Sequence, residues 1–325
     1  MLIALLWCLA GLAALVGGAE LIVRGGGRLA GRLGISPLII GLTVVALGTS
    51  APELAVGIEA AVQGNGSLAV GNIAGTNIVN ILLILGLSAM IEPLALRLQT
   101  LRFDLPMMVA AAFALMIMAW DGTLSRGEGA VLTAAAVVYT LVVIHYTRRE
   151  SRMVRVEFKQ EFGAPAAGGA PLRETAGDVG ALALGIAIVV VGADWLVDAA
   201  VALARLAQVS DAFIGLTIVA VGTSAPELVT TIVSTVRRER DIAIGNLVGS
   251  SIYNIFAILG ITCLVPADGV EVGEHLRLVD IPVMAAVALV CVPVFSSGQA
   301  ISRREGTLFV AAYAGYLAYL VLART

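Results

Sequence analysis

The chain has 325 residues, of which 59% are hydrophobic and 13% charged, and its formal net charge is −3. This composition excludes an ordinary water-soluble domain, and without a basic surplus no nucleic-acid partner is expected. Apolar runs of about 20 residues, the length needed to cross a bilayer core, recur along the chain and indicate a polytopic membrane protein.

Ten apolar segments follow one another along the chain. They lack the alternation of membrane-spanning β-strands, so each is expected to satisfy its backbone hydrogen bonds within a helix. We therefore predict an all-α membrane protein with ten transmembrane helices. The predicted spans are residues 2–23, 36–62, 68–91, 103–120, 127–146, 178–204, 211–236, 242–265, 278–296 and 305–323.

The two halves of the chain repeat each other. Residues 34–90 align with residues 208–264, nearly half of the aligned positions are identical, and weaker matches reach all five spans of each half. Because each copy has an odd number of spans, the second copy enters the membrane from the opposite side, as in many secondary transporters. We predict two inverted five-helix repeats, 1–147 and 178–325, joined by a cytoplasmic linker at 148–177.

The basic residues predict the orientation of the chain in the membrane. If the amino terminus is outside, 16 of the 20 basic residues fall in cytoplasmic connections. Cytoplasmic loops carry an excess of Lys and Arg. We therefore expect a multi-pass protein of the cell inner (plasma) membrane with both termini outside and the linker in the cytoplasm.

The stretch GTSAPEL occurs at residues 48–54 and again at 222–228. Pro52 cannot donate a backbone hydrogen bond, so it loosens the helix before it. Thr49 and Glu53 share a helix face, and Ser50 adds a hydroxyl beside them. Such oxygen ligands suit calcium or sodium, whereas zinc and copper prefer nitrogen and sulfur. The second copy repeats this set with Thr223, Ser224, Pro226 and Glu227.

A second polar element follows each copy, GNIAGTNIVN at 71–80 and GNLVGSSIYN at 245–254. In these elements the pairs on one helix face are Thr76 with Asn80, and Ser250 with Asn254. From the turn near 63–67, the helical rise puts Glu53 and Asn80 at depths of about 18 and 22 Å, near mid-membrane. Four helices are therefore predicted to meet at one midplane site.

Two further asparagines, Asn72 and Asn246, follow a glycine in these elements. Helix capping explains them at least as well as ion contact.

The paired motifs in an inverted five-plus-five arrangement resemble the two alpha repeats of the sodium/calcium exchanger family, within the cation/calcium antiporter superfamily. The resemblance implies that the second, third, seventh and eighth helices surround the ions, and that calcium is exchanged against sodium by alternating access. It further implies calcium and sodium ligation by Glu53 and Glu227, with Thr49, Ser50, Thr76, Asn80, Thr223, Ser224, Ser250 and Asn254 around them and the backbone carbonyls of Ala46 and Ala220 holding sodium.

The chain departs from this family at one point. Well-known members carry an aspartate at one of the positions matching Asn80 and Asn254, whereas both are amides here. The fixed charge of the site is then that of two glutamates, which one calcium or two sodium ions neutralise. The ion stoichiometry stays open, as do potassium dependence and the direction of flux.

Three other functions compete with sodium/calcium exchange. A proton/calcium antiporter is the nearest alternative, but protons need no cage of hydroxyl oxygens. A channel would need a continuous filter rather than two inverted copies around one site. An intramembrane hydrolase would need a base beside Ser50 or Ser224, and no histidine or lysine is placed there. We predict no enzymatic activity and no cofactor, and expect a monomer to function with calcium and sodium as its transported ions.

Overall fold

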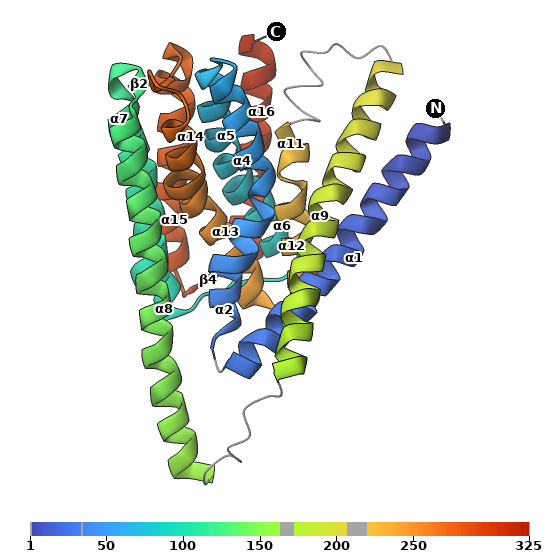
Figure 1. Cartoon of the computed structure of the whole chain (residues 1–325), viewed down its shortest axis with the longest axis vertical. Coiled ribbons are helices and arrows are strands. Elements are labelled where there is room, and N and C mark those ends of the chain that lie inside the picture. The colour runs from blue at the N-terminus through green and yellow to red at the C-terminus, as the bar shows by residue number, and fades with distance from the viewer. Residues whose placement is uncertain (1, 34, 163–171, 207–219, 325) are drawn as a thin grey trace.

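The computed structural model describes residues 2–33, 35–162, 172–206 and 220–324, which are helical almost throughout (Figure 1). The helices of the first half are α1 (Leu2–Leu33), α2 (Pro37–Ile40), α3 (Ala46–Thr49), α4 (Ala51–Val62), α5 (Gly66–Ile78), α6 (Gly86–Ile91), α7 (Leu105–Met118) and α8 (Arg126–Phe162). Between them lie the π-helical segments η1 (Gly41–Val45), η2 (Val79–Leu85) and η3 (Thr100–Asp104), the 3₁₀ turn η4 (Ala119–Asp121), and the strands β1 (Leu94–Ala95) and β2 (Thr123–Leu124).

The second half repeats this order as far as it is described. Its helices are α9 (Leu172–Leu206), α11 (Ala220–Thr223), α12 (Ala225–Val236), α13 (Arg240–Tyr253), α14 (Gly260–Leu264), α15 (Ile281–Ser296) and α16 (Arg303–Arg324). Its π-helical segments are η6 (Asn254–Leu259) and η7 (Leu276–Asp280), and its strands are β3 (Val270–Glu271) and β4 (Ala300–Ile301).

Most of the predicted spans are long helices. In the described part of the chain, 8 helical stretches are long and apolar enough to cross a membrane, and Pro37–Thr49 with Ala51–Val62 forms a further span bent by 41°. The predicted span 211–236 lies partly outside the described residues, and α12 is its second part. The all-α membrane fold with repeated halves is confirmed, and both termini lie at the same end of the bundle (Figure 1).

Two helices extend well beyond the predicted spans. α1 continues to Leu33, where its last arginines pair with acidic residues of α9: Arg28 with Asp178 at 2.7 Å and Arg32 with Glu174 at 2.6 Å. α8 continues to Phe162 through part of the predicted linker, in a stretch rich in Arg, Glu and Lys, which favour helix. Arg24, Arg28 and Arg32, which lie between the first two predicted spans, are therefore part of a helix.

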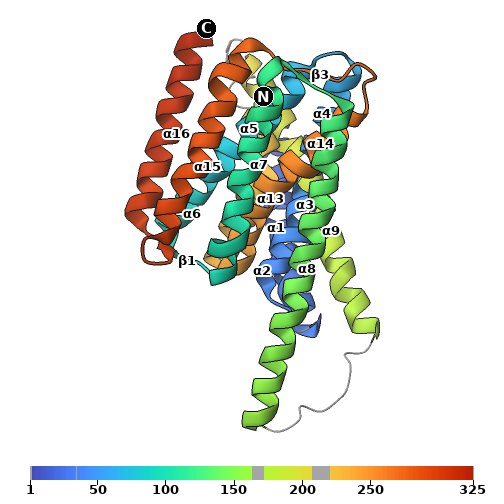
Figure 2. The ribbon, with the colours of Figure 1, turned by 90° about the vertical axis from the view of Figure 1, so that its left-hand side faces the viewer.

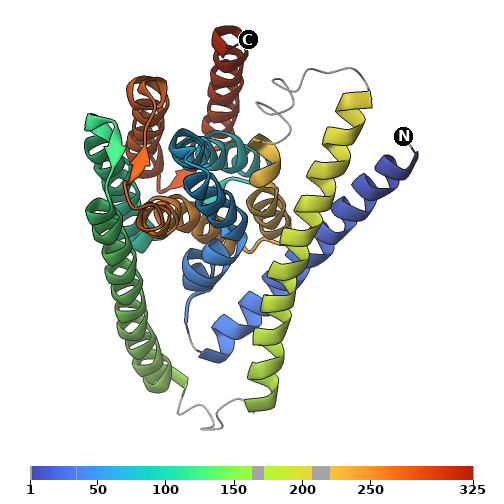
Figure 3. The ribbon, with the colours of Figure 1, turned by 45° about the horizontal axis from the view of Figure 1, so that its top comes forward.

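α1 and α9 lie side by side along one flank of the bundle and run in opposite directions (Figures 1 and 3). Glycines bring their backbones together, because a Cβ on Gly18 would lie 2.8 Å from the carbonyl oxygen of Gly185, and one on Gly11 would lie 2.8 Å from that of Gly192. The sequence repeat matches Gly11 with Gly185 and Gly18 with Gly192. The crossing is therefore the same when the two halves exchange places, as an inverted repeat requires.

Two short β-ribbons join the halves at opposite ends of the bundle (Figure 2). β1 pairs with β4 through Leu94 and Ile301, and β2 pairs with β3 through Leu124 and Val270. The sequence repeat matches Leu94 with Val270 and Leu124 with Ile301, so the two pairs are equivalent. These strands, which the all-α prediction did not include, show the same inverted symmetry at both membrane faces.

The third span of each half lies at the centre of the fold. In an apolar stretch of 18 residues from Gly66–Ile91, 78% of the residues are buried, and in Arg240–Leu264 the share is 83%, whereas in α1 it is only 22%. α13 packs against η1, α2, α3 and α12, and η2 packs against α12. The polar motifs of both halves are therefore enclosed by protein rather than by lipid.

Candidate ion-binding site

Both GTSAPEL motifs break a helix at the serine. Ser50 (φ −84°, ψ 12°) separates α3 from α4, and Ser224 (φ −87°, ψ 8°) separates α11 from α12. The predicted loosening of the helix at Pro52 is thus confirmed. Glu53 and Glu227 then lie in the first turn of the helix that follows, where free backbone N–H groups and the helix dipole favour a negative charge.

The two asparagines of the second motif lie on widened helical turns. Asn80 is in η2, and Asn254 is the first residue of η6. Short π-helical stretches of this kind occur frequently at functional sites, because they shift side chains and loosen the backbone hydrogen bonding. The repeated sequence therefore produces the same local distortion in both halves.

Side chains of one half contact the other half at the predicted site. Ser50 Oγ donates to Glu227 Oε1 at 3.0 Å, and Ser250 Oγ lies 3.4 Å from the carbonyl oxygen of Ala46. The structure thus brings the two GTSAPEL motifs together, and it places the motif at 245–254 beside the first of them. The inverted repeat predicted this meeting of the two halves.

Asn246 takes part in this cluster and does not cap a helix. It lies inside α13, where its Oδ1 accepts from Thr49 Oγ1 at 3.2 Å and its Nδ2 donates to Thr231 Oγ1 at 3.1 Å. Asn72 likewise lies within α5. The capping interpretation is wrong for both, because each helix begins earlier than the glycine suggested, and Thr231 is a buried contact that the motifs did not reveal.

Asn77 is a second residue that the sequence reasoning missed. Its Nδ2 donates to the carbonyl oxygen of Ser251 at 3.1 Å, and its Oδ1 accepts from Asn254 Nδ2 at 3.1 Å. In the second half, the residue that matches Asn77 is Ser251, so Asn77 is not one of the duplicated residues. Its position between Thr76 and Asn80 within the motif was the available signal.

Most of the predicted ligands are completely enclosed. Thr76 is 3% exposed, Thr223 is half-buried, and Ala220 is described only as part of the α11 backbone. The ligands with no exposed surface are Ala46, Thr49, Ser50, Glu53, Asn80, Ser224, Glu227, Ser250 and Asn254. Carboxylates buried this deeply within membrane-spanning helices are expensive, and they are typical of transport pathways.

Many of the enclosed oxygens have no hydrogen-bonding partner among the described residues. They include both carboxylate oxygens of Glu53, Glu227 Oε2, Ser224 Oγ, Asn254 Oδ1 and the side chain of Asn80. An unsatisfied buried polar group costs about 1–3 kcal/mol, so several in one cluster indicate that something else binds them. In the described part of the chain no three or more His, Cys, Asp or Glu side chains are grouped so that they could hold a metal ion together. Two carboxylates among hydroxyl and amide oxygens fit sodium or calcium.

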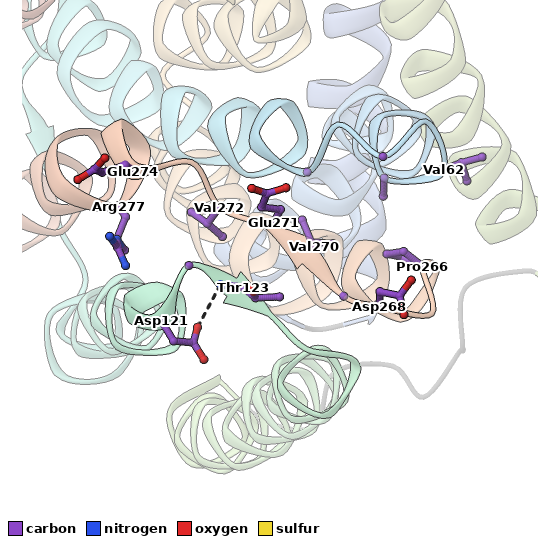
Figure 4. A pocket seen from close by; sticks show the side chains of 15 residues that line it. Val62, Asp121, Thr123, Pro266, Asp268, Val270, Glu271, Val272, Glu274 and Arg277 are labelled. Carbon is purple, nitrogen blue, oxygen red and sulfur yellow. Dashed lines mark hydrogen bonds between the residues drawn. The ribbon is translucent and has the colours of Figure 1, made fainter.

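A separate cavity of 880 Å³ opens at the end of the bundle that carries the β2·β3 ribbon (Figure 4). Asp121, Asp268, Glu271 and Glu274 line it, together with Arg277. Of the described residues around this cavity, none is a predicted ligand. Its excess of carboxylates favours cations over anions at this end of the molecule.

Comparison with known proteins agrees with this geometry. The family model described as "Sodium/calcium exchanger protein" matches residues 3–145 and 178–322. The chain is 37% identical to the inner membrane protein YrbG of Escherichia coli, covering 89% of this chain and 88% of that protein. It is 32% identical to the sodium/calcium exchanger MaX1 of Methanosarcina acetivorans, covering 96% and 97%.

A solved structure of the sodium-calcium exchanger NCX_Mj, soaked with 10 mM Na⁺ and no Ca²⁺, shares the fold with a TM-score of 0.84 and 27% identity, covering 98% of this chain and all of that one. Motifs, fold and family match therefore agree over nearly the whole length. The chain belongs to the sodium/calcium exchanger protein family.

Proposed function

We propose that this protein is an antiporter that exchanges calcium against sodium by alternating access, with Glu53 and Glu227 as its charged ligands. The observation that carries the proposal is the pair of buried carboxylates, one from each inverted half, because three of their four oxygens have no hydrogen-bonding partner among the described residues. The names of MaX1 and NCX_Mj, given above, support the same pair of ions.

The remaining predicted ligands complete an oxygen cage. Calcium takes six to eight oxygen ligands, and in this site the two carboxylates would neutralise its charge. Hydroxyl and amide oxygens would replace its water, from Thr49, Ser50, Thr76, Asn80, Thr223, Ser224, Ser250 and Asn254. The backbone carbonyls of Ala46 and Ala220 would contribute to sodium binding.

The inverted symmetry supplies a physical basis for alternating access. Because the two halves are related by a two-fold axis in the membrane plane, a conformation open to one side has a counterpart open to the other side. The same ligands would then serve both conformations. An ion bound at mid-membrane would leave by either face, with no separate site for each direction.

The coupling ion is tested by calcium-45 uptake into proteoliposomes under sodium, proton or potassium gradients imposed one at a time. We expect calcium uptake when the sodium concentration is higher inside the vesicles, so that sodium leaves as calcium enters. A proton gradient alone should drive little uptake. Uptake that follows the proton gradient equally well, without sodium, would replace this proposal by proton/calcium exchange. Saturation of the flux, together with sodium counterflow, distinguishes an antiporter from a channel.

We further propose that the protein lies in the cell inner (plasma) membrane with both termini outside, and that a monomer suffices because one chain builds the whole site. No cofactor and no enzymatic step enter the proposal. The basic residues of the predicted connections support the orientation, and the E. coli relative is named an inner membrane protein. Single cysteines at 150–170, in a background without Cys8, Cys263 and Cys291, should react only with reagents on the cytoplasmic side. Labelling from outside would invert the topology.

A further inference from the structure

The amide of Asn77 can be oriented without ambiguity. Its Nδ2 lies 3.1 Å from the carbonyl oxygen of Ser251 and 3.7 Å from the sulfur of Met284. A carbonyl oxygen only accepts hydrogen bonds, so the NH₂ group of Asn77 must face Ser251. The Oδ1 of Asn77 therefore faces Asn254, across the boundary between the two halves.

This orientation determines the orientation of Asn254 in turn. Since Asn77 Oδ1 only accepts, Asn254 must present its NH₂ group to it, and the N–O distance is 3.1 Å. The Oδ1 of Asn254 then points away from Asn77. That oxygen is buried and has no hydrogen-bonding partner among the described residues, and Asn254 itself is 0% exposed.

We propose that Asn77 is a positioning residue that holds the amide of Asn254 with its oxygen toward the ion site. The inference rests on the function proposed above and adds a residue that the repeated motifs do not indicate. A reversed Asn254 would oppose two acceptor oxygens and direct its NH₂ group, which repels a cation, at the ion. Groups that orient a metal ligand in this way change metal affinity by about 10- to 100-fold when they are removed.

The matching asparagine of the first half lacks such a support. Both side-chain atoms of Asn80 are without a hydrogen-bonding partner in the described part of the chain. The residue that matches Asn77 in the second half is Ser251. Its hydroxyl donates to the carbonyl oxygen of Leu247 in its own helix, 2.9 Å away. The two asparagines are therefore distinct: a hydrogen bond holds Asn254 in one orientation, and no described residue holds Asn80 in this way.

Calcium and sodium binding to the purified full-length protein, measured by isothermal titration calorimetry, tests the inference. Asn77→Ala should weaken calcium binding about tenfold or more. Thr262→Ala is the control, because it removes another buried hydrogen-bonding side chain from the span that carries Asn254, one that among the described residues bonds only to Ile258 O. It should change calcium affinity less than about twofold. Asn77→Leu keeps the volume and serves if Asn77→Ala does not fold.

The deciding measurement repeats Asn77→Ala in an Asn254→Asp background. A carboxylate has two equivalent oxygens and needs no orientation, so in this background loss of Asn77 should cost less than about twofold or improve binding. Equal losses in the two backgrounds would show a merely structural role for Asn77 and overturn the inference, as would unchanged affinity in Asn77→Ala. Wild-type protein that binds neither ion would instead overturn the proposed function itself, and the inference with it.

Discussion

The two helices that carry the glutamates, α4 and α12, share their first turn but differ over the rest of their length. After Glu227, α12 presents a buried row of hydroxyl groups, and after Glu53 the matching positions of α4 have none. The fully buried residues on α12 are Thr230, Thr231, Ser234 and Thr235, and their counterparts on α4 are Val56, Gly57, Ala60 and Ala61.

This difference separates the proposed ion ligands from the groups that hold them. Thr231 bonds Asn246, and Asn246 bonds Thr49 of the other half, so a hydroxyl on α12 supports a proposed ligand that α3 provides. On α4 the glycine matching Thr231, Gly57, instead allows close approach of α14, because a Cβ there would lie 2.8 Å from Thr262 Oγ1. The duplication thus preserved the predicted ligands in both halves, while the residues that support them differ between the halves: Thr231 lies in the second half and Asn77 in the first.

Substitution of the two glutamates tests the part of the proposed site that is the same in both halves. Glu53→Gln and Glu227→Gln should each reduce calcium exchange about 100-fold or more, because opposite unit charges 4 Å apart attract by about 4 kcal/mol at an effective dielectric of 20. Calcium-45 uptake into proteoliposomes measures the loss. Glu59→Gln is the matched control on the same helix, since Glu59 is exposed and bonds only Gln63 among the described residues. Wild-type flux in either site variant would remove that glutamate from the site.

Substitution of Asn254 or Asn80 by aspartate tests whether the site can hold a third carboxylate, placed in either half. Asn254→Asp adds a negative charge to the site, so we expect calcium affinity at pH 8 to rise about tenfold. Protons compete with calcium for each added carboxylate, so affinity should also fall more steeply between pH 8 and 5.5 than in the wild type. Calorimetry over this pH range, with Asn80→Asp as the mirror variant, measures both effects. Superimposable pH curves for Asn254→Asp and wild type would place Asn254 outside the site.

The serines at the two helix breaks have different partners. Ser50 donates to Glu227, whereas Ser224 Oγ has no partner among the described residues. Ser50→Ala should therefore lower both sodium affinity, several-fold, and stability, by about 1 kcal/mol. Ser224→Ala should lower sodium affinity without loss of stability. Sodium titration and thermal unfolding in detergent separate the two outcomes, and equal loss of stability in both variants would contradict the asymmetry.

The smallest effect on ion binding is expected from the supporting hydroxyls. Thr231→Ala leaves Asn246 Nδ2 without its partner and should destabilise the protein by about 1–2 kcal/mol, with a lower calcium affinity through Thr49. Thr235→Ala removes a hydroxyl that bonds only its own helix, at Thr231 O, and should change stability by less than about 0.5 kcal/mol. Thermal unfolding of both variants is the measurement. Equal shifts would show that the hydroxyl row supports no ligand.

The fold and the meeting of the polar motifs could be predicted from the sequence because each motif occurs in two copies. Helical rise gave the depth of Glu53 and Asn80, and the inversion required the second set to meet them. The same reliance on duplication hid the supporting residues. Asn77 and Thr231 have Ser251 and Gly57 in the other copy, so neither appeared as a pair.

The helix boundaries were harder to predict for a different reason. Charged residues at the end of α1 were interpreted as a connection, yet ion pairs with α9 and ordinary helix propensity continue the helix to Leu33. The short strands were also missed, since two-residue strands such as β1 have no hydrophobic period to detect. These features depend on contacts between distant segments, which a local pattern does not contain.

The two β-ribbons have a consequence for the origin of the chain. Each ribbon joins a strand of one half to a strand of the other, with the register Leu94–Ile301 at one face and Val270–Leu124 at the opposite face. A five-helix ancestor inserted in both orientations would form both ribbons between separate molecules, as a symmetric dimer. In that picture gene fusion did not create the interface between the halves; it made permanent a pairing that two copies already possessed.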